Sequence, residues 1–325
     1  MGKSISIVIP NYNGKHLLQK NIPFVFRALT YSNIIDYEII ISDDNSVDDS
    51  VLFIKQNYPS IILIENSINK GFSGNVNSGI RLATKDLVLI LNSDVQLSDK
   101  YFVPLLSFFN KSDTFGVMGK IIGLETDKLQ DAAKYPQYFF GNINGTTNYF
   151  SHKQISLYSF FISGANALVD RKKILAIGCF NEIFNPYNWE DVDLGIRAWR
   201  LGFKIYYESS SYCRHPNSAT IKNEPNKKVK VISKRNKMYL HYLHFTGFEL
   251  IYFMIFLILK TIFKTILFDK YYLKSFYLFV KNIPNLNKYK NSFKSLQRVM
   301  KCNKSVKRIV KDIKSGINSY DIEKF

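Results

Sequence analysis

The chain has few cysteines and no long uninterrupted apolar run. Cys179, Cys213 and Cys302 are odd in number and far apart, which argues against a disulfide framework and against a thiolate metal site. Within the most apolar segment, residues 248–268, the longest uncharged stretch covers only residues 250–259, whereas a helix needs about twenty apolar residues to span a bilayer. The N-terminus lacks the basic-then-apolar layout of a signal peptide. We therefore expect a cytoplasmic protein.

Acidic residues are scarce in the C-terminal third. Residues 226–325 contain 22 Lys+Arg and 5 Asp+Glu, whereas the other 225 residues contain 22 and 21, so nearly all of the net charge of +18 lies in this third. The hydrophobic fraction of 46% is ample for a folded core. We expect two parts: a catalytic domain over residues 1–225 and a basic, amphipathic helical extension over residues 226–325.

Apolar segments alternate between strand and helix patterns in the first part. Strands are predicted at residues 4–10, 37–42, 61–64, 87–91, 117–122 and 160–169, and helices at 15–31, from about 47, and at 71–83. This alternation predicts an α/β fold with a doubly wound, mostly parallel sheet flanked by helices. Ligands bind such sheets in the crevice outside the carboxyl ends of the strands.

Two acidic clusters follow predicted strands. Asp43 ends one strand and could accept from a ribose hydroxyl or a base N–H, while Asp44 and Ser46 are expected to form the turn and cap the next helix. Asp94, in the sequence Asn92-Ser93-Asp94, offers a hard oxygen ligand suited to Mg²⁺ or Mn²⁺. A helix cap is the structural alternative for Asp94.

A third acidic cluster, Glu190 and Asp191, opens a helical pattern. A partly desolvated carboxylate here could act as general base on a hydroxyl, although the helix dipole alone would also favour acidic residues. The neighbouring Trp189 favours a pocket. His215 follows a strand-like stretch and is either a further metal ligand or a structural histidine.

Two polar turns are further candidates for ligand contact. The turn Pro10-Asn11-Tyr12 ends the first strand where a backbone could approach a nucleotide, although such turns are more often structural. The glycine-rich residues 69–79, which include Asn75, open a helix whose N–H groups could hold an anion. Their spacing is neither GxGxxG nor that of a Walker lysine, so close helix packing explains the glycines equally well.

Together these segments resemble the family 2 glycosyltransferases, which have the GT-A fold, and look most like their bacterial rhamnosyltransferase-like branch. The resemblance covers residues 4–218 in order and rests on SIVIPNYNG, EIIISDDNSVDDS, NKGFSGNVNSG, LVLILNSDV, FISGANALVDRKKILAIGCFNE, NWEDVDLGIRAWRLGF and CRHPNS.

The resemblance implies a role for each candidate residue. Asp191 would be the base that deprotonates the acceptor, with Glu190 beside it. Asp94 would bind Mg²⁺ or Mn²⁺ on the donor diphosphate, with His215 near the metal. Asn92 stands where many members have the first Asp of a DxD motif, so one metal ligand is missing. The residues expected around the nucleotide-sugar donor are Pro10, Asn11, Tyr12, Asp43, Asn75, Asn92 and Ser93.

The basic extension predicts a membrane partner. In a helix over residues 248–268, Glu249, Lys260 and Lys264 fall within about 60° of one another, which leaves a broad apolar arc. Such a helix lies in the membrane interface, where clustered lysines also attract anionic lipids. We expect peripheral attachment to the inner face of the cell membrane and a saccharide or lipid-linked acceptor in cell-surface polysaccharide assembly. Packing on the catalytic domain or on a second copy in a homo-oligomer is the alternative.

Two other function classes remain open on the sequence alone. A region this basic could bind nucleic acid, but it shows no binding module and its aromatics do not interleave with its charges, so no nucleic-acid partner is expected. A sugar nucleotidyltransferase would normally show a glycine-rich, arginine-containing loop after the first strand, and the sequence NYNGKH at this position is not such a loop.

Overall fold

A computed structural model describes residues 3–139, 142–153, 156–216 and 226–325. Its strands are β1 (Ile5–Asn11), β2 (Tyr37–Asp43), β3 (Ile62–Glu65), β4 (Leu87–Leu91), β5 (Gln96–Leu97), β6 (Thr114–Gly123), β7 (Leu129–Asp131), β8 (Ala133–Phe139), β9 (Asn142–Phe150), β10 (Leu157–Tyr158), β11 (Asn166–Asp170), β12 (Lys204–His215) and β13 (Glu323–Lys324).

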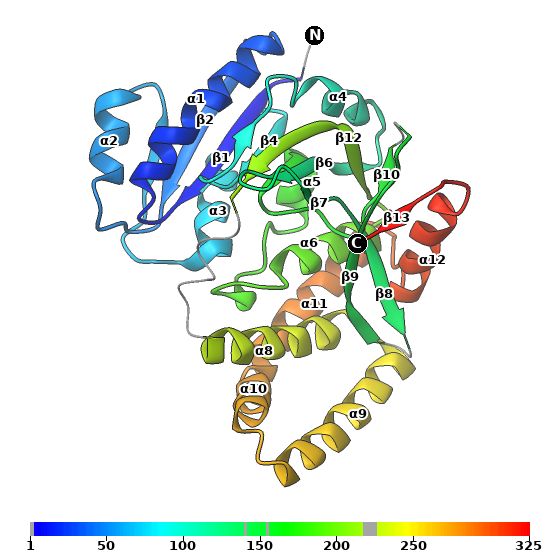
Figure 1. The fold of residues 1–325 in the computed structure, drawn as a ribbon. Helices are drawn as coiled ribbons and strands as arrows, with labels where there is room; N and C mark the ends of the chain where they lie inside the picture. Colours follow the sequence, from blue (N-terminus) through cyan, green and yellow to red (C-terminus); the bar gives the residue numbers. More distant parts are fainter. Residues whose placement is uncertain (1–2, 140–141, 154–155, 217–225) are drawn as a thin grey trace.

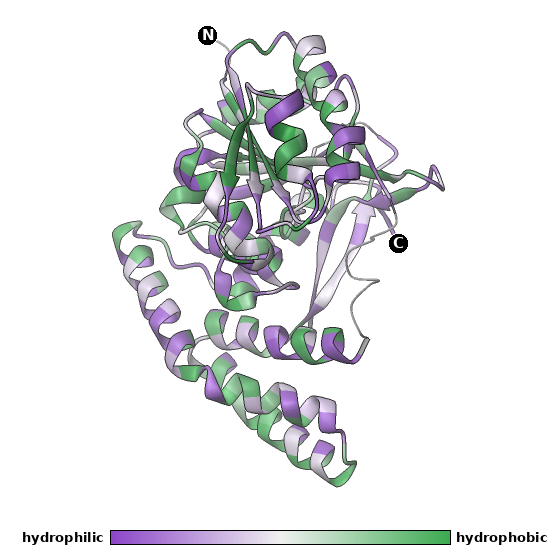
Figure 2. Cartoon of the chain, turned by 90° about the vertical axis from the view of Figure 1, so that its left-hand side faces the viewer, coloured by the Kyte–Doolittle hydropathy of each residue, from purple (hydrophilic) through white to green (hydrophobic). Residues whose placement is uncertain are grey.

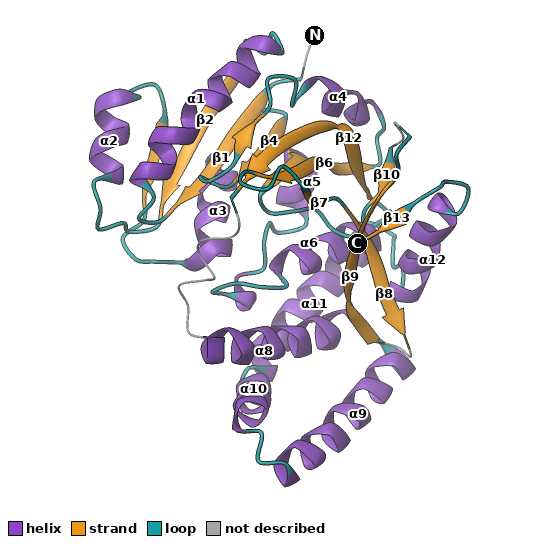
Figure 3. Cartoon of the chain, viewed as in Figure 1, coloured by secondary structure: helices purple, strands orange, loops and turns teal. Residues whose placement is uncertain are grey.

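The helices comprise α1 (Lys15–Tyr31), α2 (Ser50–Asn57), α3 (Gly71–Leu82), α4 (Val103–Leu106), α5 (Arg171–Ala176), α6 (Glu190–Arg200), α8 (Asn226–His244), α9 (Gly247–Ile266), α10 (Lys270–Lys281), α11 (Ile283–Val299) and α12 (Val306–Ile317), with 3₁₀ turns η1 (Ser107–Asn110) and η2 (Glu182–Phe184). Figures 1 and 3 show the central sheet with helices on both faces and a helical C-terminal region. The predicted α/β architecture with a helical extension is confirmed.

The central sheet of the described residues has ten strands in the order β10-β12-β6-β11-β4-β1-β2-β3, with β5 paired to β12 and β7 to β6. The runs of Ile, Val and Leu in β1, β2 and β4 are buried on both sides, as parallel strands covered by helices require. β1 pairs in parallel with β2 and β4, and β2 with β3. The carboxyl ends of β1, β2 and β4 therefore meet at one edge.

The strand predicted at residues 160–169 is only partly right, because β11 begins at Asn166. Phe160 and Phe161 are buried against α6 instead, where Gly195 leaves room: a Cβ there would lie 2.5 Å from the Cβ of Phe161 and 2.8 Å from the carbonyl oxygen of Phe160. The apolar run thus reflects burial between layers and not sheet pairing. A second sheet, β13-β9-β8, was not predicted by the sequence patterns.

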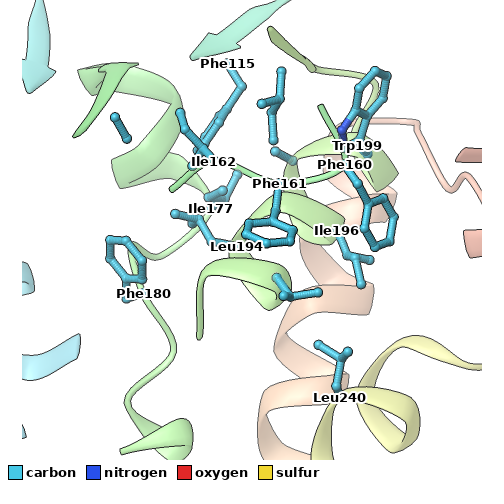
Figure 4. Packing of buried hydrophobic residues seen from close by; sticks show 14 of the residues in the cluster. Phe115, Phe160, Phe161, Ile162, Ile177, Phe180, Leu194, Ile196, Trp199 and Leu240 are labelled. Atoms are coloured by element: carbon cyan, nitrogen blue, oxygen red, sulfur yellow. The ribbon is translucent and has the colours of Figure 1, made fainter. Parts of the chain in front are cut away.

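The C-terminal helices share a hydrophobic core with the part of the chain that contains the central sheet. Leu240 of α8 belongs to the same buried cluster as Phe161, Leu194 and Ile196, as Figure 4 shows. The predicted division of the chain between residues 225 and 226 remains a prediction. Residues 217–225, next to this boundary, lie outside the described ranges.

α9 and α10 project from the base of the molecule in Figure 1, and Figure 2 shows hydrophobic stretches along these projecting helices. Of the residues in α9, only Phe253 and Leu257 are buried. Among the described residues, none of the helices combines the length and apolar character that crossing a bilayer requires.

Candidate active site

The ends of β1 and β2 form the first part of the site. Asn11 pairs in register with Asp43, and both side chains are almost inaccessible. The Asp43 carboxylate accepts from Asn11 Nδ2 at 2.8 Å, from Ser46 Oγ at 2.6 Å and from the Ser46 N–H at 2.9 Å. The oxygen Oδ1 of Asn11 has no hydrogen-bond partner among the described residues. The Asp43 carboxylate therefore stabilises this turn through three hydrogen bonds. Its contact with a nucleoside remains a prediction.

Other predicted donor residues gather at the same edge. Asn75 of α3 donates to the Asn11 carbonyl oxygen at 3.2 Å and accepts from Asn66 at 3.0 Å. Pro10 is half-buried, whereas Tyr12 is 55% exposed. The structure brings these residues together, and their part in donor binding stays a prediction.

The expectation that Asp44 and Ser46 cap the following helix is wrong. The Asp44 carboxylate accepts from the backbone N–H groups of Lys70 at 2.8 Å and Gly71 at 3.0 Å, so it caps α3, and Ser46 bonds to Asp43. Burial raises the pKa of Asp44, while the two N–H groups and the Lys70 charge oppose the rise. Asp44 thus connects the end of β2 with the start of α3.

Asp94 and His215 come together although they are far apart in sequence. β5 pairs antiparallel with β12, which places Asp94 Oδ1 3.3 Å from His215 Nε2. The contact does not have hydrogen-bond geometry, and Asp94 Oδ1 is a buried oxygen without a hydrogen-bond partner. A cation fits such a pair, because Mg²⁺ or Mn²⁺ usually takes one or two protein ligands and completes its shell with water and substrate phosphate.

The residues before Asp94 are fixed by their backbone. The Asn92 N–H donates to the Ala165 carbonyl oxygen at 3.1 Å, and Asn21 Nδ2 donates to the Ser93 carbonyl oxygen at 2.9 Å. Both side chains are half-buried. In the described part of the chain, no group of three or more His, Cys, Asp or Glu side chains could hold a metal.

Glu190 and Asp191 open α6 after an unusual turn. Asn188 and Trp189 have φ angles of 74° and 76°, in the left-handed region that residues with a Cβ rarely adopt. Asp191 Oδ1 accepts from the Val192 N–H at 2.8 Å, and Glu190 Oε2 is buried without a hydrogen-bond partner among the described residues. Burial raises the pKa of both carboxyls, that of Glu190 further because the charge of Asp191 adds to it. Raised carboxyl pKa values suit a group that takes a proton near neutral pH.

The turn is held by α8, from a region in which no site residue was predicted. Asn236 is fully buried, and its Nδ2 lies within hydrogen-bond distance of the carbonyl oxygens of Phe184 (2.5 Å), Tyr187 (2.9 Å) and Asn188 (2.9 Å). Its Oδ1 accepts from Arg235, whose Nη2 also donates to the Asn185 carbonyl oxygen at 2.6 Å. No local sequence signal identifies these two residues, since they act on backbone groups about 50 residues earlier.

The third acidic residue of this helix, Asp193, has a structural role. Its carboxylate accepts from Arg197 Nε at 2.8 Å and contacts His244 Nε2 at 2.9 Å, and all three side chains are buried. Burial would raise the pKa of Asp193, but Arg197 and His244 hold it below its ordinary value. Burial lowers the pKa of His244, so a neutral imidazole donates to the carboxylate. α8 therefore fixes both the start and the buried face of α6.

Asn185 joins the two halves of the site. Its Nδ2 donates to the Lys70 carbonyl oxygen at 2.7 Å, and Gly71, with φ of 70°, would place a Cβ 3.2 Å from Asn185 Oδ1. The turn before Glu190 thus rests on the start of α3, which Asp44 caps from the end of β2. The carboxylates at the start of α6 and the turn at the ends of β1 and β2 are parts of one connected framework.

Comparisons with known proteins bear on the family of the chain. A poly(ribitol-phosphate) beta-glucosyltransferase of Bacillus spizizenii is 29% identical over 124 residues, 37% of this chain and 19% of the relative. An N-acetylglucosaminyl-diphospho-decaprenol L-rhamnosyltransferase of Mycobacterium tuberculosis is 24% identical over 212 residues, 58% of this chain and 69% of the relative. The chain spans 19% to 40% of the length of the first curated relatives it matches.

A solved structure, GalNAc-T7 with UDP, GalNAc and Mn²⁺, superposes with a TM-score of 0.66 at 14% identity, covering 98% of this chain and 57% of that one. This likeness shows the GT-A fold. The family model "Glycosyl transferase family 2" matches residues 6–177, more than half of the chain. The chain therefore belongs to glycosyltransferase family 2, as its motifs predicted.

Proposed function

We propose that the protein is an inverting, metal-dependent glycosyltransferase. It moves a sugar from a nucleotide-sugar donor to a hydroxyl of a lipid-linked saccharide, at the inner face of the cell membrane, in the assembly of a cell-surface polysaccharide. Family membership supports the reaction class, and neither the nucleic-acid-binding nor the nucleotidyltransferase alternative gains support from any relative.

The observation that carries the proposal is the division of the polar groups into two sets. Asp94 and His215 meet where β5 pairs with β12, with one buried carboxylate oxygen left without a hydrogen bond. Glu190 and Asp191 stand at the start of α6 with raised pKa values. A metal-binding pair and a separate base are what an in-line displacement at a sugar carbon needs.

In this mechanism each set has one task. Asp94 and His215 would hold the divalent cation, which would supply positive charge against the departing nucleoside diphosphate. The turn around Asn11 and Asp43 would receive the nucleoside. The Asp191 carboxylate takes the proton of the acceptor hydroxyl as it attacks, and Glu190 keeps a proton at neutral pH because burial and the charge of Asp191 raise its pKa.

The surface of α9 supports the membrane part of the proposal. Glu249, Phe253, Leu257, Lys260 and Lys264 fall within about 80° around the helix. Phe253 and Leu257 are buried, and Glu249 Oε1 accepts from a tyrosine hydroxyl of β8 at 2.7 Å, so this stripe faces the protein. The polar side of the helix is therefore turned inward.

The apolar arc of α9 is turned outward. A group of large hydrophobic side chains along it is between 50% and 61% exposed: Ile251, Ile255, Ile258, Leu259, Ile262 and Phe263. An exposed apolar face of this length, on a region that is strongly basic, matches the interior and the anionic surface of a lipid leaflet.

The catalytic part is tested with Asp191→Asn. The amide keeps the shape but cannot take a proton, so transfer should fall by about 100-fold or more, while UDP with Mn²⁺ still stabilises the protein against heat. Asp113→Asn, which removes a carboxylate from a half-exposed pair with Lys204, is the control and should transfer normally. Near-normal turnover of Asp191→Asn with saturating substrates would remove Asp191 from the role of base.

The membrane part is tested by sedimentation with vesicles of phosphatidylglycerol and phosphatidylcholine. Replacing Ile255, Leu259 and Phe263 with serine should weaken vesicle binding by about 100-fold, because each side chain contributes about 1 kcal/mol when its exposed part enters the lipid. Ile35→Ser, at a 93% exposed site on the catalytic part, should leave binding unchanged. A wild-type protein that stays in the supernatant and self-associates through α9 would instead support the homo-oligomer alternative.

A further inference from the structure

Four lysines gather where α8, α9 and α10 meet. The Nζ atoms of Lys234 and Lys260 lie 5.8 Å and 5.7 Å from the ring centroid of Tyr272, so two ammonium groups share one aromatic ring. Lys264 lies 3.2 Å and Lys234 3.6 Å from the Asp269 carboxylate. One carboxylate therefore stands beside several positive charges.

Lys237, the fourth lysine, connects this group to the turn before Glu190. Its Nζ lies 5.6 Å from the centroid of the Trp189 ring and donates to the Asn144 carbonyl oxygen at 3.3 Å. Within the described part of the chain, neither Lys237 nor Lys260 has a carboxylate within ion-pair distance. Burial and the charge of Lys260 lower the pKa of Lys237, and burial with the charges of Lys264 and Lys234 lowers that of Lys260. Such mutual repulsion is relieved by an anion.

A cavity lies beside Trp189, the residue whose ring Lys237 covers. Its volume is about 270 Å³, and its lining includes Phe161, Trp189, Ser233, Asn188 and Thr146. An aromatic ring together with hydroxyl and amide groups suits a sugar, which presents apolar C–H faces and hydroxyl edges. Trp189 directly precedes Glu190, so a sugar in this cavity would be next to the proposed base.

The order of these features matches the order of chemical groups in a lipid-linked saccharide. Trp189 lines the cavity, Lys237 lies over the Trp189 ring, Lys260 shares the Tyr272 ring with Lys234, and Lys260 belongs to α9, the helix that carries the apolar arc. We propose that Lys234, Lys237 and Lys260 bind the phosphate or diphosphate that joins the acceptor saccharide to its lipid, with the acceptor sugar in the cavity beside Trp189. This inference rests on the proposed function and assigns its acceptor site.

The test is binding of farnesyl diphosphate, a short soluble lipid diphosphate, to the full chain saturated with UDP and Mn²⁺ so that the donor site is filled. Lys237→Gln/Lys260→Gln should weaken binding by about tenfold or more. The matched control is Lys274→Gln/Lys281→Gln, which removes two exposed lysines of α10 from the same projecting region. Thermal stabilisation by UDP with Mn²⁺ verifies that both variants are folded.

The outcomes separate the inference from its alternatives. Loss only in Lys237→Gln/Lys260→Gln supports the site, whereas equal loss in the control would reduce it to diffuse attraction by the basic region and overturn it. Inorganic pyrophosphate binding as tightly as farnesyl diphosphate would assign the lysines to free diphosphate and overturn the acceptor role. Farnesol binding as tightly would remove the lysines from recognition altogether. A wild-type protein that binds UDP and glycosylates a water-soluble saccharide, yet ignores farnesyl diphosphate, would refute this inference and leave the proposed function standing.

Discussion

Replacing Asn236 with alanine should impair catalysis more than donor binding. The side chain has two N–H hydrogens for three carbonyl oxygens, so the wild type makes about two full hydrogen bonds to the backbone before Glu190. A buried carbonyl that loses its donor costs about 1–3 kcal/mol, so the loss of two such bonds should lower the free energy of unfolding by about 2–6 kcal/mol. The left-handed residues Asn188 and Trp189 would then relax.

The catalytic effect follows from the position of Asp191. A displacement of about 1 Å can cost 100-fold in rate, because the base must reach the proton of the acceptor hydroxyl. We expect kcat to fall 10- to 100-fold in Asn236→Ala, with a much smaller change in the Kd for UDP, since none of the three carbonyl groups that Asn236 Nδ2 contacts lies in the turn around Asn11. The assays are urea denaturation, calorimetric titration of UDP with Mn²⁺, and initial rates of transfer.

Two further variants make the test discriminating. Asn236→Asp has nearly the same shape but puts a second oxygen against the three carbonyl groups, so it should be at least as impaired as alanine. Asn287→Ala removes an exposed amide that accepts from Tyr242 at 2.7 Å and should cost less than about 1 kcal/mol of stability without a change in kcat. A variant Asn236→Ala that is destabilised as expected but turns over normally would refute the positioning role.

Four other predictions concern the acidic residues. Asp94→Asn should weaken Mn²⁺-dependent stabilisation by UDP at least tenfold, and an unchanged Mn²⁺ titration would remove Asp94 as a ligand. Glu190→Gln should raise the Tm at pH 8 but hardly at pH 4. The pKa of Glu190 is higher in the folded than in the unfolded protein, so ionisation of Glu190 destabilises the fold as the pH rises above the unfolded pKa. An equal gain in Tm at both pH values would contradict the raised pKa. Burial also raises the pKa of Asp191, so kcat should fall with decreasing pH as Asp191 gains a proton. A pH profile of kcat should place this fall at a higher pH than the ordinary pKa of a carboxyl. His244→Leu should lower the free energy of unfolding by about 3 kcal/mol because Asp193 loses a buried partner. Urea denaturation measures this loss, and a much smaller value would contradict the structural role of the pair.

The alternation of apolar segments predicted the sheet well where local pattern and burial agree. β1, β2 and β4 lie within a residue or two of their predicted positions because each is a continuous Ile, Val and Leu run bounded by turn residues. The run at residues 160–169 fails for the same physical reason: burial between two layers selects the same apolar residues as a strand does. The β8–β9 hairpin is rich in polar and aromatic residues, so it gives no clear alternation.

Strand ends identified several candidate side chains, because a carboxylate after a buried strand is visible in sequence. Asp94 and His215 are an example: each follows or ends a strand, and the pairing of β5 with β12 brings them together. Asn236 and Lys237 could not be found this way. They act on Asn188 and Trp189 across about 50 residues, and their contacts depend on how α8 crosses the start of α6. Such tertiary contacts leave no local pattern.

The dependence of α6 on α8 has a consequence for synthesis on the ribosome. When Asp193 and Arg197 have left the exit tunnel, His244 and Asn236 have not yet followed, so a nascent chain exposes a helix whose polar groups lack their final partners. Desolvating these groups early would be unfavourable, because an unpaired buried charge costs several kcal/mol. The catalytic helix should therefore stay loosely packed until the basic helices emerge. The protein would then become competent only when the segment that we propose meets the membrane is itself being made.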